Sequence, residues 1–137
     1  MREEYEDSGK VRFDYRHFIV ISPESADAAN ASECAADQGR FWDYHDLLMS
    51  RSGTAANVFS KAALKQYATE LGLDAAAFNA CVDGDTHLEK VYQDVNDGRA
   101  QGVGSTPTFF INGEKVEGAV AYEQFKSIVD GYLANAQ

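Results

Sequence analysis

The apolar positions of this chain change their period along its length, from strand-like to helical and back again. Residues 11–21 begin with apolar and charged side chains in alternation and end in a continuous apolar run, which is typical of a half-buried strand. Residues 108–112 and 114–117 are two further short runs with strand character, separated by a turn that contains Asn112-Gly113, a strong hairpin signal. These patterns predict three strands.

Between the first and second of these strands the apolar spacing becomes helical. Ser22-Pro23 predicts the start of an alanine-rich helix that runs to about Gln38, since serine is a good N-cap and proline fits the first helical position. We expect four more helical segments before the hairpin, at about 41–51, 60–71, 74–82 and 85–101. A last helix has a clean apolar stripe formed by Phe125, Ile128, Val129, Tyr132 and Leu133.

Composition narrows the class of protein. A chain of 137 residues with 45% hydrophobic and 12% aromatic residues can bury one genuine core, so we expect a single compact domain. The net charge of -10 argues against nucleic acid and against anionic membrane surfaces as partners. No apolar run approaches the roughly 20 residues of a bilayer span, so we expect no membrane insertion. The polar, acidic start does not read as a signal peptide.

Residues 103–113 carry the most specific signal in the chain, because Thr106-Pro107 stands directly before an apolar strand. Proline cannot donate a hydrogen bond to a sheet, so its place here suits a tight turn at the start of the strand. A cis peptide bond is useful in such a turn, although the spacing alone does not establish one.

Four segments together carry a resemblance to a known family. Residues 102–113 resemble the cis-proline segment of the thioredoxin superfamily and, more narrowly, that of DsbA-type thiol–disulfide oxidoreductases. Residues 8–13 resemble the strand after that family's active-site helix. Residues 38–48, and 71–74 with 78–81, resemble parts of its inserted helical subdomain.

The resemblance implies an α/β (α+β) fold, thioredoxin-like with a helical insertion. The thioredoxin-like part would comprise residues 1–22 and 102–137, and the insertion residues 23–101. The family's first strand and active-site helix are expected to be largely missing, with residues 1–8 as the last turns of that helix. Since the missing strand lies between the strands at 11–21 and 108–112 in the family, we expect either direct pairing of these two or a homodimer formed by strand pairing or swapping.

The family's chemistry resides in a Cys-x-x-Cys pair, and this chain contains none. Its cysteines are Cys34 and Cys81, each in a helical segment beside acidic residues, which disfavours a reactive thiolate. They are either two buried free thiols or a disulfide. The resemblance favours the disulfide, because some relatives carry a second bridge in the helical subdomain. Such a bridge closes a loop of about 48 residues, worth roughly 4 kcal/mol in the chain-entropy model.

Thr106 and Pro107 are the candidate substrate-binding residues. The resemblance implies that this loop binds extended or unfolded polypeptides through backbone groups. The alternative is that Pro107 only shapes the turn. No pair of cysteine or histidine residues has zinc-ligand spacing, so we expect no metal site and no cofactor. Phe41, Trp42 and Tyr44 form either a substrate-binding patch or, at their helical spacing, anchors of the core.

The resemblance leaves three hypotheses for function. The first is a DsbA-family protein whose parent function is disulfide formation or exchange in exported proteins, with this chain redox-inactive on its own. The second is a non-catalytic thioredoxin-like module that binds peptides or dimerises. The third is a relative of glutathione-linked transferases or isomerases. Enzymatic activity is therefore left open, and the implied location is periplasmic or otherwise extracytoplasmic.

Overall fold

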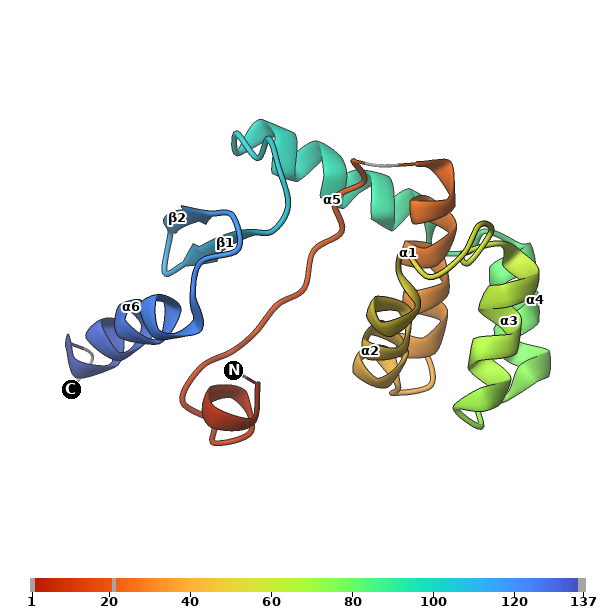
Figure 1. The fold of residues 1–137 in the computed structure, drawn as a ribbon, viewed down its shortest axis with the longest axis horizontal. Helices are drawn as coiled ribbons and strands as arrows, with labels where there is room; N and C mark the ends of the chain where they lie inside the picture. The colour runs from red at the N-terminus through yellow and green to blue at the C-terminus, as the bar shows by residue number, and fades with distance from the viewer. Residues whose placement is uncertain (1, 21, 136–137) are drawn as a thin grey trace. The chain divides into compact units, whose positions relative to one another are not determined.

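A computed structural model describes residues 2–20 and 22–135 of the chain. The elements are η1 (Arg2–Glu6, a short π-helical turn), α1 (Pro23–Ala36), α2 (Phe41–Arg51), α3 (Lys61–Glu70), α4 (Ala75–Asp83), α5 (Leu88–Ala100), β1 (Thr108–Ile111), β2 (Glu114–Glu117) and α6 (Tyr122–Asn135) (Figure 1). The mixed α+β class expected from the sequence is confirmed. None of the described helices is both long enough and apolar enough to cross a bilayer.

The chain divides into two compact units. The hairpin unit comprises Met1–Arg16 and Arg99–Gln137, and the helical unit comprises His17–Gly98. The boundaries expected from the sequence, with residues 23–101 as an inserted subdomain, stay a prediction.

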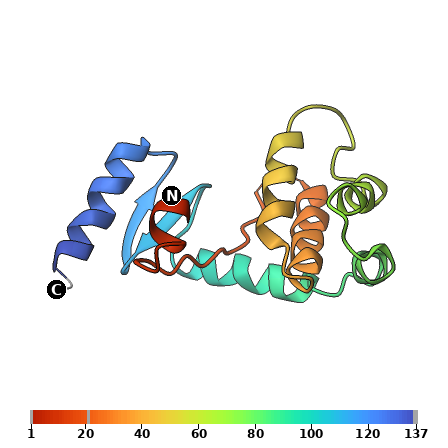
Figure 2. The same cartoon turned by 90° about the horizontal axis from the view of Figure 1, so that it is seen from below.

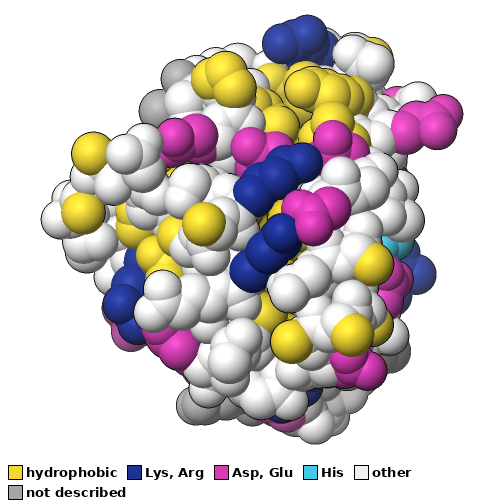
Figure 3. Space-filling view, turned by 90° about the vertical axis from the view of Figure 1, so that its right-hand side faces the viewer, with side chains coloured by type: hydrophobic (Ala, Val, Ile, Leu, Met, Phe, Trp, Pro, Cys, Tyr) yellow, Lys and Arg dark blue, Asp and Glu magenta, His cyan; other side chains and the backbone are white. Residues whose placement is uncertain are grey.

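In the helical unit, α1 packs against α2 and α4, and α3 packs against α4 (Figure 1, Figure 2). Ala31 and Ala35 of α1 are fully buried, and their small side chains let the neighbouring helices approach closely. Tyr44 and Phe78 are also fully buried, with ring centroids 5.3 Å apart. The surface of this unit carries mixed charge, since basic and acidic side chains lie side by side on the face viewed in Figure 3. Ion pairs of 2.6 Å join Lys61 to Asp85 and Lys65 to Asp83 in this unit.

Side-chain caps fix the starts of two of these helices. Asp74 accepts a hydrogen bond from the backbone N–H of Ala77 at 3.1 Å, and Ser60 accepts one from Ala63 at 3.4 Å. Ser22 is the N-cap of α1, as the sequence predicts, but its side chain makes no capping bond to the backbone. The proline that follows it has no N–H to satisfy, and its fixed φ already suits a helix.

The hairpin unit consists of β1, β2, α6 and the N-terminal turn. The strands pair antiparallel, with Thr108 opposite Glu117 and Ile111 opposite Glu114. Asn112 and Gly113 form the turn with positive φ of 49° and 91°, as the Asn-Gly signal predicts. Figure 2 shows the hairpin and α6 from a second direction.

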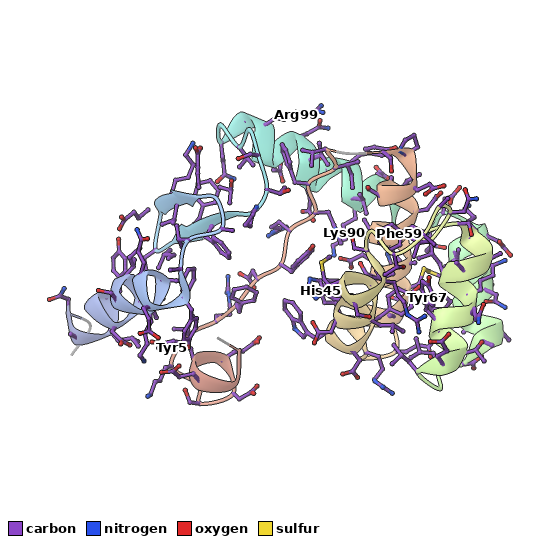
Figure 4. All side chains as sticks on the ribbon, in the orientation of Figure 1. Tyr5, His45, Phe59, Tyr67, Lys90 and Arg99 are labelled. Atoms are coloured by element: carbon purple, nitrogen blue, oxygen red, sulfur yellow. A yellow bond between two sulfur atoms is a disulfide. The ribbon has the colours of Figure 1, made fainter. Side chains whose placement is uncertain are left out.

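Apolar packing holds α6 and the N-terminal turn together in this unit. Phe125 and Val129 of α6 are buried with Tyr5 of η1, and the rings of Phe109 and Phe125 lie 5.0 Å apart. The Tyr5 hydroxyl donates a hydrogen bond to Asp130 at 2.7 Å. Burial and this hydrogen bond raise the pKa of Tyr5, so its hydroxyl stays a donor at neutral pH. Tyr5 is labelled in Figure 4.

The strand predicted over residues 11–21 is wrong for the part that the structure describes. Residues 11–20 have no strand assignment, and residue 21 lies outside the described residues. Val11 does pack against the apolar cluster of the hairpin unit, but Val20 is 50% exposed. Alternation indicates only that a segment can be a half-buried strand, whereas a strand also needs a partner for its backbone groups. Among the described residues the sheet contains β1 and β2 alone, so the expected direct pairing of 11–21 with 108–112 is also wrong there.

Candidate functional site

The loop before β1 presents Thr106 and Pro107 on the surface. The peptide bond between them is cis, and both residues are exposed. The Thr108 hydroxyl donates a hydrogen bond to the carbonyl oxygen of Ser105 at 2.8 Å, which ties the loop to the first residue of the strand. A polypeptide segment can therefore approach the backbone of this loop from solvent.

The hydrogen-bonding direction of β1 follows from one bond at its start. The backbone N–H of Gly118 donates to the carbonyl oxygen of Pro107 at 2.8 Å, so the backbone carbonyl of Pro107 points toward the β2 side of the hairpin. Along an antiparallel strand, residues alternate between those that exchange hydrogen bonds with the partner strand and those that do not. The backbone groups of Thr108 and Phe110 therefore point away from β2. We call these groups the open edge of β1, since among the described residues β1 pairs only with β2.

Side chains of β1 that alternate with the open-edge residues anchor the strand to α6. Phe109 and Ile111 pack into the cluster formed with α6, whereas the Phe110 side chain is 44% exposed. A strand that is anchored by alternate side chains keeps its free backbone groups in an extended, evenly spaced row. Such a row is what an added strand needs.

The two cysteines are joined to each other in the helical unit, as the resemblance led us to expect. A disulfide links Cys34 of α1 to Cys81 of α4, with Cα atoms 5.9 Å apart, and it appears as a yellow bond in Figure 4. Cys34 is only 1% exposed. Both sulfur atoms are thus committed to a bridge between two packed helices, and the chain has no further cysteine.

A histidine and a carboxylate lie beside this bridge. One imidazole nitrogen of His87 and the Sγ atoms of Cys34 and Cys81 all lie within 4.8 Å of one another. The Nε2 atom of His87 is 2.7 Å from Oδ2 of Asp37, which follows α1. We call Cys34, Cys81 and His87 the sulfur–histidine cluster.

The helical unit also contains a buried ion cluster. His17 Nε2 lies 2.8 Å from one carboxylate oxygen of Glu33, and Lys90 Nζ lies 2.5 Å from the other. The hydrogen bond from His17 and, after it, that from Lys90 lower the pKa of Glu33 to about 2, against the effect of burial. Asp94 is 5% exposed and accepts a hydrogen bond from the backbone N–H of His17 at 3.1 Å. This cluster fixes the start of the unit onto α1 and α5.

The comparison with family models decides the class of the protein. A model described as Thioredoxin matches residues 1–131. This chain belongs to the thioredoxin family. The DsbA-type subgroup that the sequence resembles is a finer assignment, and it remains a proposal.

Three relatives of this thioredoxin-family chain bear a transporter name. This chain is 33% identical over 139 residues to the Na(+)/H(+) antiporter NhaA 3 of Salinispora tropica, and the match covers the whole of this chain and 21% of that protein. It is 37% identical over 109 residues to the Na(+)/H(+) antiporter NhaA of Herminiimonas arsenicoxydans, across 80% of this chain and 17% of that protein. The corresponding protein of Mycolicibacterium gilvum, NhaA 1, is 35% identical over 109 residues, across 76% of this chain.

The chain therefore spans about a fifth of the length of the curated relatives it matches. No solved structure matches it. The family assignment rests on the family model.

The aromatic residues of α2 differ in burial, and a substrate-binding role for them stays a prediction. Tyr44 is fully buried, and its hydroxyl donates to the carbonyl oxygen of Leu64 at 2.8 Å, so it anchors the core. Phe41 and Trp42 are partly exposed, and their ring centroids lie 5.0 Å apart. His45, labelled in Figure 4, lies 5.3 Å from Trp42 by ring centroids.

Sequence reasoning missed the ion cluster and the neighbours of the disulfide. His17 and Glu33 come together across 16 positions, and His87 and Asp37 across 50. No local spacing pattern reports such pairs. The one available signal was a charged residue, Glu33, among the alanines of the predicted helix.

Proposed function

We propose that this chain is a thioredoxin-like module that binds an extended polypeptide at Thr106-Pro107 and along the open edge of β1. The supporting observation is the open edge itself, which lies directly after an exposed cis-proline loop in the same strand. The chain is not a thiol oxidase on its own in this proposal.

Strand addition is the binding mode that these groups favour. The backbone N–H and C=O groups of Thr108 and Phe110 offer hydrogen bonds that do not depend on the side chains of the bound polypeptide. The exposed Phe110 ring adds apolar contact at the same edge. Binding through backbone hydrogen bonds depends little on the side chains of the bound polypeptide. This property suits a module that accepts unfolded polypeptides of varied sequence.

The cysteine chemistry supports the non-catalytic part of the proposal. Thiol–disulfide exchange needs an accessible thiolate, and Cys34 is bridged and 1% exposed. The test is to incubate the chain with a reduced, unfolded disulfide protein and follow disulfide formation. Turnover above that of a Cys34→Ser/Cys81→Ser variant would refute it. The DsbA-type parent activity and a glutathione-linked activity both stay predictions.

The names of the relatives suggest a setting for this module. We propose that it serves a longer sodium/proton antiporter protein, and that the polypeptide it binds is an extended segment of such a protein outside the bilayer. The disulfide favours an extracytoplasmic location, because disulfides persist in oxidising compartments.

We also propose that a second copy of the chain occupies the open edge when no other polypeptide is present, which gives the homodimer expected from the sequence. Sedimentation analysis of the chain alone measures this directly. A mass of one chain at high concentration contradicts the dimer and leaves polypeptide binding to be decided by the next experiment.

Two proline substitutions test the open edge. Phe110→Pro removes an N–H that points away from β2, so the β1–β2 ladder keeps its bonds, and proline is tolerated at such edges. Lys115→Pro removes the corresponding N–H on the opposite edge of the hairpin, because Lys115 is paired with Phe110 in the register. A third variant, Phe110→Ala, removes the ring and keeps the N–H.

The assay is fluorescence anisotropy with a labelled, carboxymethylated unfolded protein. We expect Phe110→Pro to weaken binding at least about tenfold, the equivalent of one lost hydrogen bond to a well-placed group. Pro107→Ala should also weaken binding, because it changes the loop that leads into the open edge. Lys115→Pro should bind as the unaltered chain does, and Phe110→Ala should bind with intermediate affinity. Equal loss in Phe110→Pro and Lys115→Pro, or no binding by the unaltered chain, contradicts the proposal.

A further inference from the structure

The sulfur–histidine cluster has the donor set of a metal site, although its linear spacing gives no sign of one. Two sulfur atoms and one imidazole nitrogen lie within 4.8 Å of one another, and they come from α1, from α4 and from the residue directly before α5. In a tetrahedral zinc site, bonds of about 2.3 Å to sulfur and about 2.0 Å to nitrogen place the donor atoms about 3.5–4 Å apart. The imidazole nitrogen of His87 lies within 4.8 Å of both sulfurs, whereas the two sulfurs are bonded to each other and reach this separation only after reduction.

Contacts that do not involve sulfur hold the histidine in place. The backbone N–H of His87 donates to the side-chain oxygen of Asn30 at 2.9 Å, and Asn30 is fully buried in α1. The carbonyl oxygen of His87 accepts a bond from Val91 at 3.0 Å in the first turn of α5. Thr86, one residue earlier, donates through its hydroxyl to the carbonyl oxygen of Cys81 at 3.1 Å. These bonds hold His87 in place relative to α1 and α4, and none of them depends on the bond between the two sulfurs.

A carboxylate, that of Asp37, also lies beside the cluster. Oδ2 of Asp37 is 2.7 Å from Nε2 of His87 and 3.9 Å from Sγ of Cys81. Histidine ligands in metal sites commonly bond a carboxylate, which orients the ring and raises its basicity. The negative charge of Asp37, 3.9 Å from Sγ of Cys81, also attracts a cation to the cluster.

We propose that the reduced form of this chain binds one zinc ion, or a divalent metal of the same class, through Cys34, Cys81 and His87. Asp37 is a positioning residue for His87, and water takes the fourth position. The proposal does not depend on polypeptide binding at the open edge.

The chemistry balances with a thiol as the reductant. Two R–SH groups give two electrons and two protons to the Cys34–Cys81 bond, which yields two cysteine thiols and one R–S–S–R. Zinc then replaces the two thiol protons, which leave to solvent, and His87 coordinates as the neutral ring. Disulfide and metal complex exclude each other, so the bond between α1 and α4 is either S–S or S–Zn–S.

The ligand types select the metal class. Thiolate and imidazole suit Zn²⁺ and Cu⁺, whereas Mg²⁺ and Ca²⁺ need oxygen ligands. The metal enters from the side of Cys81 and His87, which are partly exposed, because Cys34 is buried. The Cα atoms of the two cysteines are 5.9 Å apart, so the sulfurs separate to about 4 Å by side-chain rotation without a shift of either helix.

The experiment uses the full chain, reduced with a phosphine and desalted without oxygen, then titrated with Co²⁺ and afterwards with Zn²⁺. We expect one cobalt ion per chain, a thiolate-to-cobalt charge-transfer band, and the visible absorption of a four-coordinate ion that zinc then bleaches. The oxidised chain should show none of these. Far-ultraviolet circular dichroism of the reduced chain, before and after metal, reports whether the helices are present.

Variants separate this site from adventitious binding to thiols. His87→Ala should weaken zinc binding by more than about tenfold and shift the visible cobalt spectrum, and Asp37→Asn should weaken binding about 10–100-fold. His45→Ala, the matched control, should bind as the unaltered chain does. The proposal is overturned by the absence of stoichiometric binding, by unchanged affinity in His87→Ala, or by a reduced chain that has lost its helices and does not regain them with zinc.

Discussion

Replacement of Glu33 by glutamine removes the charge at the centre of the buried ion cluster and keeps the size of the side chain. Glu33 is 8% exposed, and its carboxylate bonds both His17 and Lys90. These hydrogen bonds lower its pKa from 4.5 to about 2. At about 1.4 kcal/mol per pKa unit, the folded state favours the charged form by up to about 3.5 kcal/mol. Since Lys90 is half exposed, we expect Glu33→Gln to lower the free energy of unfolding by about 2–3 kcal/mol at pH 7.

The pH dependence gives the sharper test. Because the folded pKa of Glu33 lies below its unfolded value, its stabilising contribution is complete above about pH 4.5 and is lost as the pH falls toward 2. Urea unfolding of the oxidised chain, followed by circular dichroism from pH 7 to pH 3, should show that the gap in stability between the unaltered chain and Glu33→Gln is constant above about pH 4.5 and narrows below it. Carboxylates that do not contact Glu33 contribute equally in both proteins, so their contributions cancel in the difference.

Glu70→Gln is the matched control, since it makes the same chemical change in the exposed ion pair of Glu70 with Arg51 at 2.9 Å. An exposed pair is worth less than about 1 kcal/mol, so we expect a small effect with no comparable gap at pH 7. A gap between the unaltered chain and Glu33→Gln that stays constant down to pH 3, or equal effects of the two substitutions, contradicts the assignment of this contribution to Glu33.

Three further changes test the packing of the helical unit, each by urea unfolding. Reduction of the Cys34–Cys81 bridge without metal should lower the free energy of unfolding by up to about 4 kcal/mol, since a sequence separation of 47 residues closes a long loop; no change in the midpoint argues against a stabilising bridge. Tyr44→Phe should cost about 1 kcal/mol through its lost buried hydrogen bond, and a stability equal to that of the unaltered chain contradicts this. Asp74→Ala should cost about 1 kcal/mol and Ser22→Ala only a few tenths, because of these two residues Asp74 alone makes a side-chain capping bond; the reverse order refutes the capping argument.

Local signals predicted most of the elements. The Asn112-Gly113 turn and the paired apolar runs gave the hairpin, because turn chemistry and strand period act over a few residues. The helices of the helical unit followed from periodic apolar positions and from caps such as Asp74. In each case the residues that determine the element lie within it or directly beside it.

The features that local patterns did not predict involve partners distant in sequence. Residues 11–20 have the pattern of a strand, but that pattern does not show whether another strand lies beside them to pair with their backbone. The bridge between Cys34 and Cys81 was expected only through the resemblance, and neither Asp37 nor His87 was connected to it. Zinc-ligand spacing patterns describe pairs of ligands a few residues apart in the sequence. Such patterns do not detect donor atoms that come together from separate helices.

The central claim is that an extended polypeptide adds to the open edge of β1, and amide hydrogen exchange measured by NMR tests it most directly. With a carboxymethylated unfolded protein added to the full chain, the account predicts that the amides of Thr108 and Phe110 become protected, while those of the helical unit keep their rates. Unchanged exchange at Thr108 and Phe110, or new protection confined to the helical unit, contradicts the account.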